Sequence, residues 1–139
     1  MSTDINARHP EIPVVVSPDT GRPNRVPPGQ RLTRRWPVLH FGRVPAINET
    51  DWAFSISGLV AEEKRLSLPE FHSLPMVRVL SDIHCVTRWS RLDNTWEGVS
   101  TCAVRDLANV LPEARFVVVH GAARFTTNLT IPMFNIEVK

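Results

Sequence analysis

The residues of this sequence with the clearest chemical potential lie in one short segment, 82–90, which reads Asp-Ile-His-Cys-Val-Thr-Arg-Trp-Ser. The cysteine of this segment, Cys85, directly follows His84, and Arg88 stands three positions after it. Nearby cationic groups favour the thiolate form of a cysteine, and a thiolate is both a nucleophile and a soft metal ligand. Three roles are therefore open for Cys85: a metal ligand, a nucleophile, or a small side chain of the core.

The residues around Cys85 argue against some of these roles. No Cys-x-x-Cys or paired-histidine spacing accompanies Cys85, which argues against a classical zinc site. A cysteine hydrolase would need His84 or His120 as its base. Adjacent residues of an extended chain point to opposite faces, so His84 is poorly placed to activate Cys85. The guanidinium of Arg88 suits either an oxyanion or a surface salt bridge.

Alternating apolar residues place Cys85 just after a predicted strand at 76–82, in the loop that follows it. A turn at Asp93–Asn94 is expected before a short strand at 95–97. The other expected elements are a strand at 52–57, a helix at 68–74 behind a Ser67–Glu70 capping box, a helix capped by Ser100 or Thr101, a buried-type strand at 115–119, and its hairpin partner at 124–129. The order β-α-β-β-α-β-β predicts a mixed α+β domain with short helices.

Proline dominates the beginning of the chain. Eight of the twelve prolines lie before position 46, and proline lacks an amide donor and favours extended neighbours. Residues 1–24 are therefore expected to form a disordered leader. Residues 25–50 are expected to form an extended arm at the start of a single domain that covers 25–139.

Several segments, taken with the stretch around Cys85, resemble the sulfite-oxidase-like molybdopterin oxidoreductases, and in particular their bacterial single-domain branch. The similarity runs in the family's order over about 25–129. The segments that carry it are Arg25-Val-Pro-Pro-Gly-Gln30, Trp36-Pro-Val-Leu-His-Phe-Gly42, Trp52-Ala-Phe-Ser-Ile-Ser-Gly58, Ser90-Arg-Leu-Asp93, Trp96-Glu-Gly-Val99, His120-Gly121 and Phe125-Thr-Thr-Asn-Leu129.

This resemblance implies the sulfite-oxidase molybdopterin-binding fold and a Mo-molybdopterin cofactor. It implies that Cys85 is the thiolate ligand of Mo and that Trp96 walls the pocket. Sulfite oxidases carry arginines shortly after their cysteine at a different offset, and Arg88 is the candidate here for drawing an oxyanion toward the metal. The residues that the resemblance implies as cofactor contacts are Leu39, His40, Phe41, His120, Gly121, Thr126 and Thr127. The implied reaction is oxygen-atom transfer to or from a small oxo-anion or S-oxide at Mo. The sequence holds no haem-attachment Cys-x-x-Cys-His motif, so a separate electron-transfer partner is expected.

The resemblance ends after Leu129, because residues 130–139 do not match the family's continuation, which helps to hold the pterin phosphate. The sequence thus predicts a member of the family whose C-terminal part is missing. A second function therefore stays open, that of a truncated, non-catalytic remnant that acts as a binding module or has no activity.

Composition and charge fit a globular protein of one domain. Hydrophobic residues make up 42% of the chain. The net charge of +2 is too small to indicate a nucleic-acid-binding surface. The two cysteines, Cys85 and Cys102, do not form a disulfide framework, and Cys102 is expected in the core face of a helix. No apolar run is long enough for a membrane span, and the first residues lack a secretory signal, so a cytoplasmic location is expected.

Overall fold

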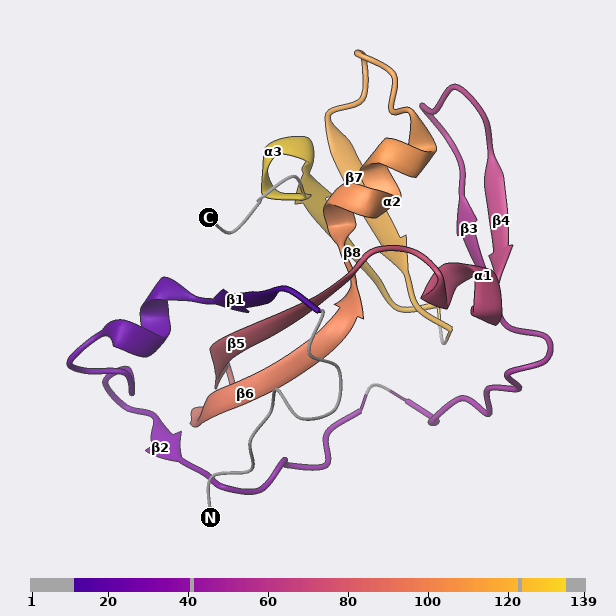
Figure 1. The fold of residues 1–139 in the computed structure, drawn as a ribbon. Coiled ribbons are helices and arrows are strands. Elements are labelled where there is room, and N and C mark those ends of the chain that lie inside the picture. Colours follow the sequence, from indigo (N-terminus) through magenta and orange to yellow (C-terminus); the bar gives the residue numbers. More distant parts are fainter. Residues whose placement is uncertain (1–11, 41, 123, 135–139) are drawn as a thin grey trace. The chain divides into compact units, whose positions relative to one another are not determined.

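The computed structural model describes residues 12–40, 42–122 and 124–134. Within these ranges the chain forms two compact units, one made of residues 12–36 with Met76–Gly98, the other of Pro37–Pro75 with residues 99–134. Short helices accompany mixed and antiparallel strands (Figure 1), which confirms the α+β class.

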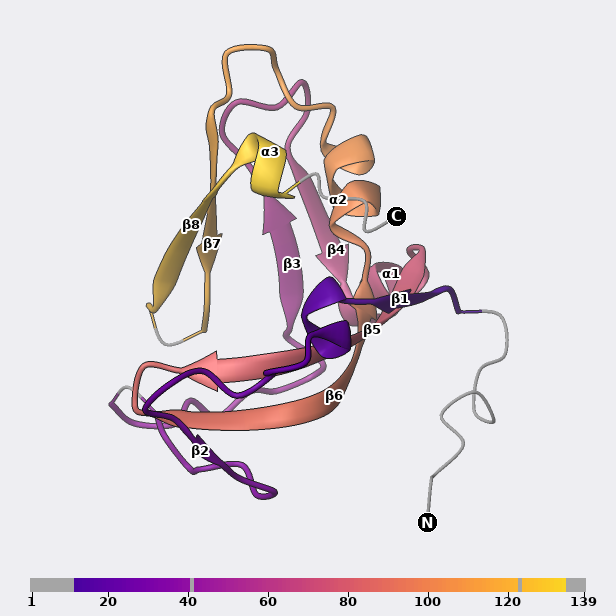
Figure 2. The same cartoon turned by 90° about the vertical axis from the view of Figure 1, so that its left-hand side faces the viewer.

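The first unit is a four-stranded mixed sheet in the order β1-β5-β6-β2. Its centre is a long hairpin, in which β5 and β6 run side by side (Figure 2). A short strand is added in parallel to each side of this hairpin, with Val15 opposite Val79 and Arg31 opposite Trp89. The four strands are β1 (Val14–Val16), β5 (Met76–Cys85), β6 (Trp89–Val99) and β2 (Arg31–Leu32).

The hairpin turns at residues 86–88, so the turn predicted at Asp93–Asn94 is wrong. Strand β5 extends through Cys85, and the amide of Arg88 closes the turn by donating to the Cys85 carbonyl over 3.0 Å. Asp93 does adopt a left-handed φ of 55°, as its turn propensity suggests. Its amide donates to the Asp82 carboxylate at 3.0 Å, however, and β6 continues past it. The local preference therefore produces an irregularity inside a strand instead of a turn.

Residues 12–24, which the prolines assign to a disordered leader, are ordered in the structure. They contain β1 and a 3-10 turn, Pro18–Gly21. The carbonyl of Pro13 accepts from the amide of Arg78 at 2.9 Å, and the amide of Ser17 donates to the Leu80 carbonyl at 2.9 Å. Proline is tolerated beside an edge strand, where its missing donor breaks no ladder bond. Residues 1–11 of the expected leader lie outside the described residues.

The second unit contains two antiparallel strand pairs, β3 with β4 and β7 with β8, together with three short helices. The Ser67–Glu70 capping box is present, and the Ser67 amide donates to the Glu70 carboxylate at 2.7 Å. Ser100 caps the next helix by accepting from the Cys102 amide at 3.2 Å. The elements are β3 (Ala53–Ile56), β4 (Lys64–Ser67), α1 (Leu68–His72), α2 (Thr101–Ala108), β7 (Phe116–His120), β8 (Thr126–Thr130) and α3 (Ile131–Phe134).

Aromatic packing joins α1 to β3. The ring of Phe71 lies 4.7 Å from that of Phe54 and 5.4 Å from that of Trp52, centroid to centroid. The burial expected for 115–119 is wrong, since Phe116 is 61% exposed and Val118 54% exposed. An unbroken valine run predicts cover on both faces of a strand. Strand β7 instead pairs with β8 alone in a two-stranded ribbon (Figure 2).

None of the helices in the described ranges combines the length and the apolar character that crossing a membrane requires.

A forked ion pair fixes one side of the β5–β6 hairpin. Arg25 donates to Asp82 twice, from Nε at 2.8 Å and from Nη2 at 2.6 Å, and the same Nη2 lies 2.6 Å from Asp93. The Asp82 side chain has no exposed area. The Arg25 guanidinium holds the pKa of the Asp82 carboxyl below its usual range, against the opposing effect of burial.

Asp82→Asn is expected to lower the free energy of unfolding at pH 7 by roughly 1–2 kcal/mol, because a charge-assisted pair becomes a neutral contact. Since the folded-state pKa of Asp82 is lowered, this contribution is present above the unfolded pKa of about 3.9 and is lost as the pH falls through the folded value. Urea unfolding at pH 7 and at pH 3 measures the difference, with Glu113→Gln as an exposed control. Equal losses at both pH values would contradict the assignment.

Candidate functional site

Cys85 is a free, half-buried thiol at the last position of β5. Its Sγ accepts a hydrogen bond from the Thr87 hydroxyl at 3.2 Å. That bond, followed by the backbone amides of Thr87 and Val86, lowers the pKa of the thiol and outweighs the opposing effect of burial. The hairpin tip therefore favours a thiolate that is partly exposed to solvent. This environment suits a metal ligand or a nucleophile better than an unreactive core residue.

His84 takes part in a hydrogen-bond chain that does not include the Cys85 thiol. Its Nδ1 lies 2.9 Å from Oγ of Ser90, and that hydroxyl donates to Oε1 of Gln30 at 2.6 Å. A hydroxyl has one proton to donate, so the proton of the first bond belongs to Nδ1 of His84. Within the described residues, the hydrogen bond at the Cys85 thiol comes from Thr87 and not from the His84 ring, so the structure gives no support to His84 as a base. His120, the other candidate base, lies at the end of β7 in the second unit.

Arg88 ends the hairpin turn with an exposed side chain and a left-handed φ of 66°. In the described part of the chain no carboxylate pairs with its guanidinium, so the salt-bridge alternative is not found there. A non-glycine residue in this conformation carries a free-energy cost, and such residues are enriched at functional sites. The observation favours a side chain that is kept for binding.

Trp96 belongs to an aromatic cluster in the first unit. Its indole Nε1 donates to Oγ of Ser81 at 3.1 Å, and its ring lies 5.5 Å from Trp36. Trp36 also meets Trp89 edge-on at 6.0 Å, and the Arg91 guanidinium lies 4.7 Å from a Trp36 ring centroid. Trp96 remains 43% exposed, so it has both a fixed orientation and a free surface. The contact of Trp96 with Trp36, and that of Trp36 with Arg91, were not anticipated from the sequence.

The expected pterin contacts that the structure describes belong to the second unit. Leu39 and His40 are exposed, and His40 uses Nδ1 to donate to the Gly42 carbonyl at 2.7 Å. His120 pairs with Thr126 in the β7–β8 register, and the next pair along contains Thr127. The structure thus brings the hairpin residues together. Gly121 closes this end of the hairpin through its amide, which donates to the Phe125 carbonyl at 2.7 Å, and Phe41 lies outside the described residues.

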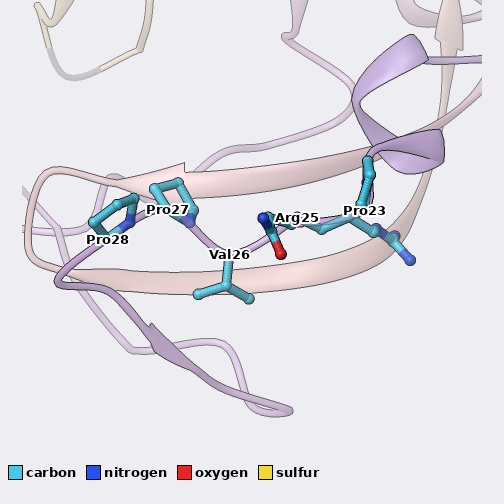
Figure 3. Close-up of a pocket in the computed structure, with 6 residues that line it drawn as sticks. Pro23, Arg25, Val26, Pro27 and Pro28 are labelled. Carbon is cyan, nitrogen blue, oxygen red and sulfur yellow. The ribbon is translucent and has the colours of Figure 1, made fainter.

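The arm supplies a site neighbour that residue types alone did not reveal. Nε2 of Gln30 donates to the carbonyl of Cys85 at 3.3 Å. The signal that could have found it is the Arg25–Gln30 segment, whose similarity to the family had no chemical explanation. A depression of about 460 Å³ lies on this segment (Figure 3), but Cys85 is not among the residues that line it, which are Pro23, Asn24, Arg25, Val26, Pro27 and Pro28.

One group of possible metal ligands in the described residues includes His84 but not Cys85. Atoms of Asp19, Asp82 and His84 fall within 4.8 Å of one another. The Asp82 carboxylate already holds Arg25, Asp19 accepts from the hydroxyl of Ser17, and His84 is bonded to Ser90. A cation at this position would have to displace a guanidinium, so the thiol is the better metal ligand.

Two comparisons relate this chain to known proteins. Residues 41–136 match the family described as "Oxidoreductase molybdopterin binding domain". A curated relative from Bacillus subtilis (strain 168), named "Uncharacterized oxidoreductase YuiH", is 43% identical over 114 residues, which is 81% of this chain and 58% of the relative. The chain thus spans a little over half the length of that relative.

Thr87→Val is expected to raise the pKa of the Cys85 thiol, because the first of the groups that lower it is removed. Alkylation by iodoacetamide at pH 7 should therefore slow, since only the thiolate reacts. The rate is measured in a Cys102→Ser background, which leaves a single thiol, with Thr126→Val as the control. An unchanged rate at pH 7 would show that the hydroxyl does not control the thiol.

Proposed function

The chain belongs to the oxidoreductase molybdopterin-binding domain family, and from this premise we propose that it acts in oxygen-atom transfer with Mo-molybdopterin. Cys85 is the Mo ligand in this proposal. The observation that carries it is the half-exposed thiol at the tip of the β5–β6 hairpin, where a hydroxyl and two amides favour the thiolate. Soft sulfur donors suit a redox-active metal of this kind.

Each unit, considered by itself, offers donor groups that suit a part of the cofactor. Cys85 offers sulfur to the metal, and the polar groups of His120 and Thr126 offer hydrogen bonds to a pterin edge. His40 donates from Nδ1 to Gly42, and its imidazolium form also donates from Nε2, which suits a phosphate oxygen. Mo-molybdopterin, when bound, supplies the two-electron redox change that oxygen-atom transfer requires.

In this proposal, two side chains of the first unit bind the substrate and restrict the space around it. Arg88 carries a positive charge on an exposed side chain with no carboxylate partner among the described residues, so it binds and orients an oxyanion. Trp96 is held by Ser81 and Trp36 and restricts the space around the substrate. The substrate class that fits a single arginine is a small oxo-anion or S-oxide, and a separate carrier exchanges the electrons.

A non-catalytic binding module is the second candidate function. The observation that favours it is the exposed apolar surface of β7, where Phe116 and Val118 are both more than half exposed. Apolar surface of this kind often marks a contact with another macromolecule. The two functions differ in metal content, because the module needs no Mo.

Cys85→Ser is expected to abolish Mo retention. The chain is expressed in a host that makes the cofactor, and Mo and pterin are measured per mole of folded protein. The unsubstituted chain and Cys102→Ser should both hold near-stoichiometric Mo, because Cys102 belongs to α2 and not to the β5–β6 hairpin. Folded protein without Mo would favour the binding module over the enzyme.

Arg88→Gly tests the oxyanion site and separates it from the fold. The variant should weaken binding of sulfite to the loaded protein by about tenfold or more, because a charge-assisted contact is lost. It should also stabilise the fold slightly, since glycine adopts the left-handed conformation freely. Arg124→Gly is the matched control, because Arg124 also has a left-handed φ, of 61°. Titration calorimetry measures affinity, and equal affinities in the two variants would contradict the role of Arg88.

A further inference from the structure

Gln30 contacts both strands of the hairpin that carries Cys85. Its Nε2 donates to the Cys85 carbonyl at 3.3 Å, and its Oε1 accepts from the Ser90 hydroxyl at 2.6 Å. The Ser90 hydroxyl in turn accepts from Nδ1 of His84 at 2.9 Å. Ser90 has no exposed area, so water does not compete for these bonds at its hydroxyl. One amide side chain therefore bridges the end of β5 and the start of β6.

A tight turn delivers this side chain. The Gln30 amide donates to the Pro27 carbonyl at 3.1 Å, and Gly29 has a φ of 76°. Proline followed by a glycine with positive φ is the pattern of a type II turn. A side chain on Gly29 would meet no atom within 4 Å, so the backbone conformation, and not lack of space, requires glycine.

Both ends of the segment are anchored to the same hairpin. Upstream of the turn, Arg25 holds the buried Asp82 on β5. Downstream, the Arg31 amide donates to the Arg88 carbonyl at 3.1 Å, and the Thr33 amide donates to the Ser90 carbonyl at 2.9 Å. The position of Gln30 is therefore set from two sides.

The Cys85 carbonyl accepts from two donors, the Arg88 amide at 3.0 Å and the Gln30 side chain. Two donors on one carbonyl fix the orientation of that peptide and so the direction of the Cys85 side chain. We propose that Gln30 is a positioning residue for Cys85. The segment 25–30 places the Gln30 side chain across the hairpin tip. The inference rests on the proposed role of Cys85 as the Mo ligand.

Gln30→Ala is tested first in the chain without cofactor, by hydrogen exchange of individual amides. Exchange of the Arg88 amide should accelerate by about twofold to tenfold, the effect of losing one supporting hydrogen bond. Amides of β3 and α2 should keep their rates. Thr33→Val is the matched control, because it removes a side-chain bond on the same arm, to the Arg35 carbonyl, and leaves the hairpin contacts in place.

Gln30→Glu separates the two halves of the bridge. A carboxylate still accepts from Ser90 but does not donate to the Cys85 carbonyl, so the Arg88 amide should exchange as fast as in Gln30→Ala. Rates equal to those of the unsubstituted chain in both variants would overturn the inference. Uniform acceleration across both units would also overturn it, since that result indicates a general loss of stability.

Mo retention, measured in a host that makes the cofactor, tests whether the Gln30 bridge affects metal binding. Gln30→Ala should hold less Mo than Thr33→Val, and equal Mo contents would overturn the positioning role. Failure of the proposed function has a different signature, because there the unsubstituted chain itself holds no Mo. The exchange measurements then still decide whether Gln30 orders the Cys85 peptide.

Discussion

The fork of Arg25 on the buried carboxylate of Asp82 is the interaction on which the first unit depends. It joins a proline-rich segment, which has few amide donors of its own, to the middle of a long hairpin. Once Arg25 is fixed, the path of the chain brings Gln30 to the hairpin tip and Trp36 to the indoles of β6. Without a cation beside it, the Asp82 carboxylate would be left buried and uncompensated, which is costly.

The electrostatics of the tip differ from what the residue types suggest. Cationic neighbours were expected to favour the thiolate of Cys85, yet the groups that lower its pKa are the Thr87 hydroxyl and two backbone amides. Neutral donors stabilise the thiolate without consuming a positive charge. His84 is engaged with Ser90, and the charge of Arg88 remains available for a ligand. In the proposed function, metal binding and anion binding therefore belong to different groups of the hairpin.

Local sequence patterns predicted the parts of the fold that local forces determine. The strand at Ala53–Ile56, the capping box of α1, the Ser100 cap and the β7–β8 pairing are all confirmed. Strands β1 and β2 were missed because two or three residues show no periodicity, and their pairing depends on partners distant in sequence. For the same reason the sequence identified Cys85 as a candidate but not Gln30, whose contacts with the hairpin depend on residues distant in sequence.

The parallel strands at the two sides of the hairpin have a consequence for synthesis on the ribosome. Arg25 and Asp82 are separated by 57 positions, and Gln30 and Ser90 by 60. At about 5–20 residues per second, the N-terminal segment waits roughly 3–12 s for its partners to be made. Its prolines and arginines keep it from forming premature strand pairs during that interval. The prolines and arginines that obscure strand periodicity in this segment therefore also protect the nascent chain until the hairpin emerges.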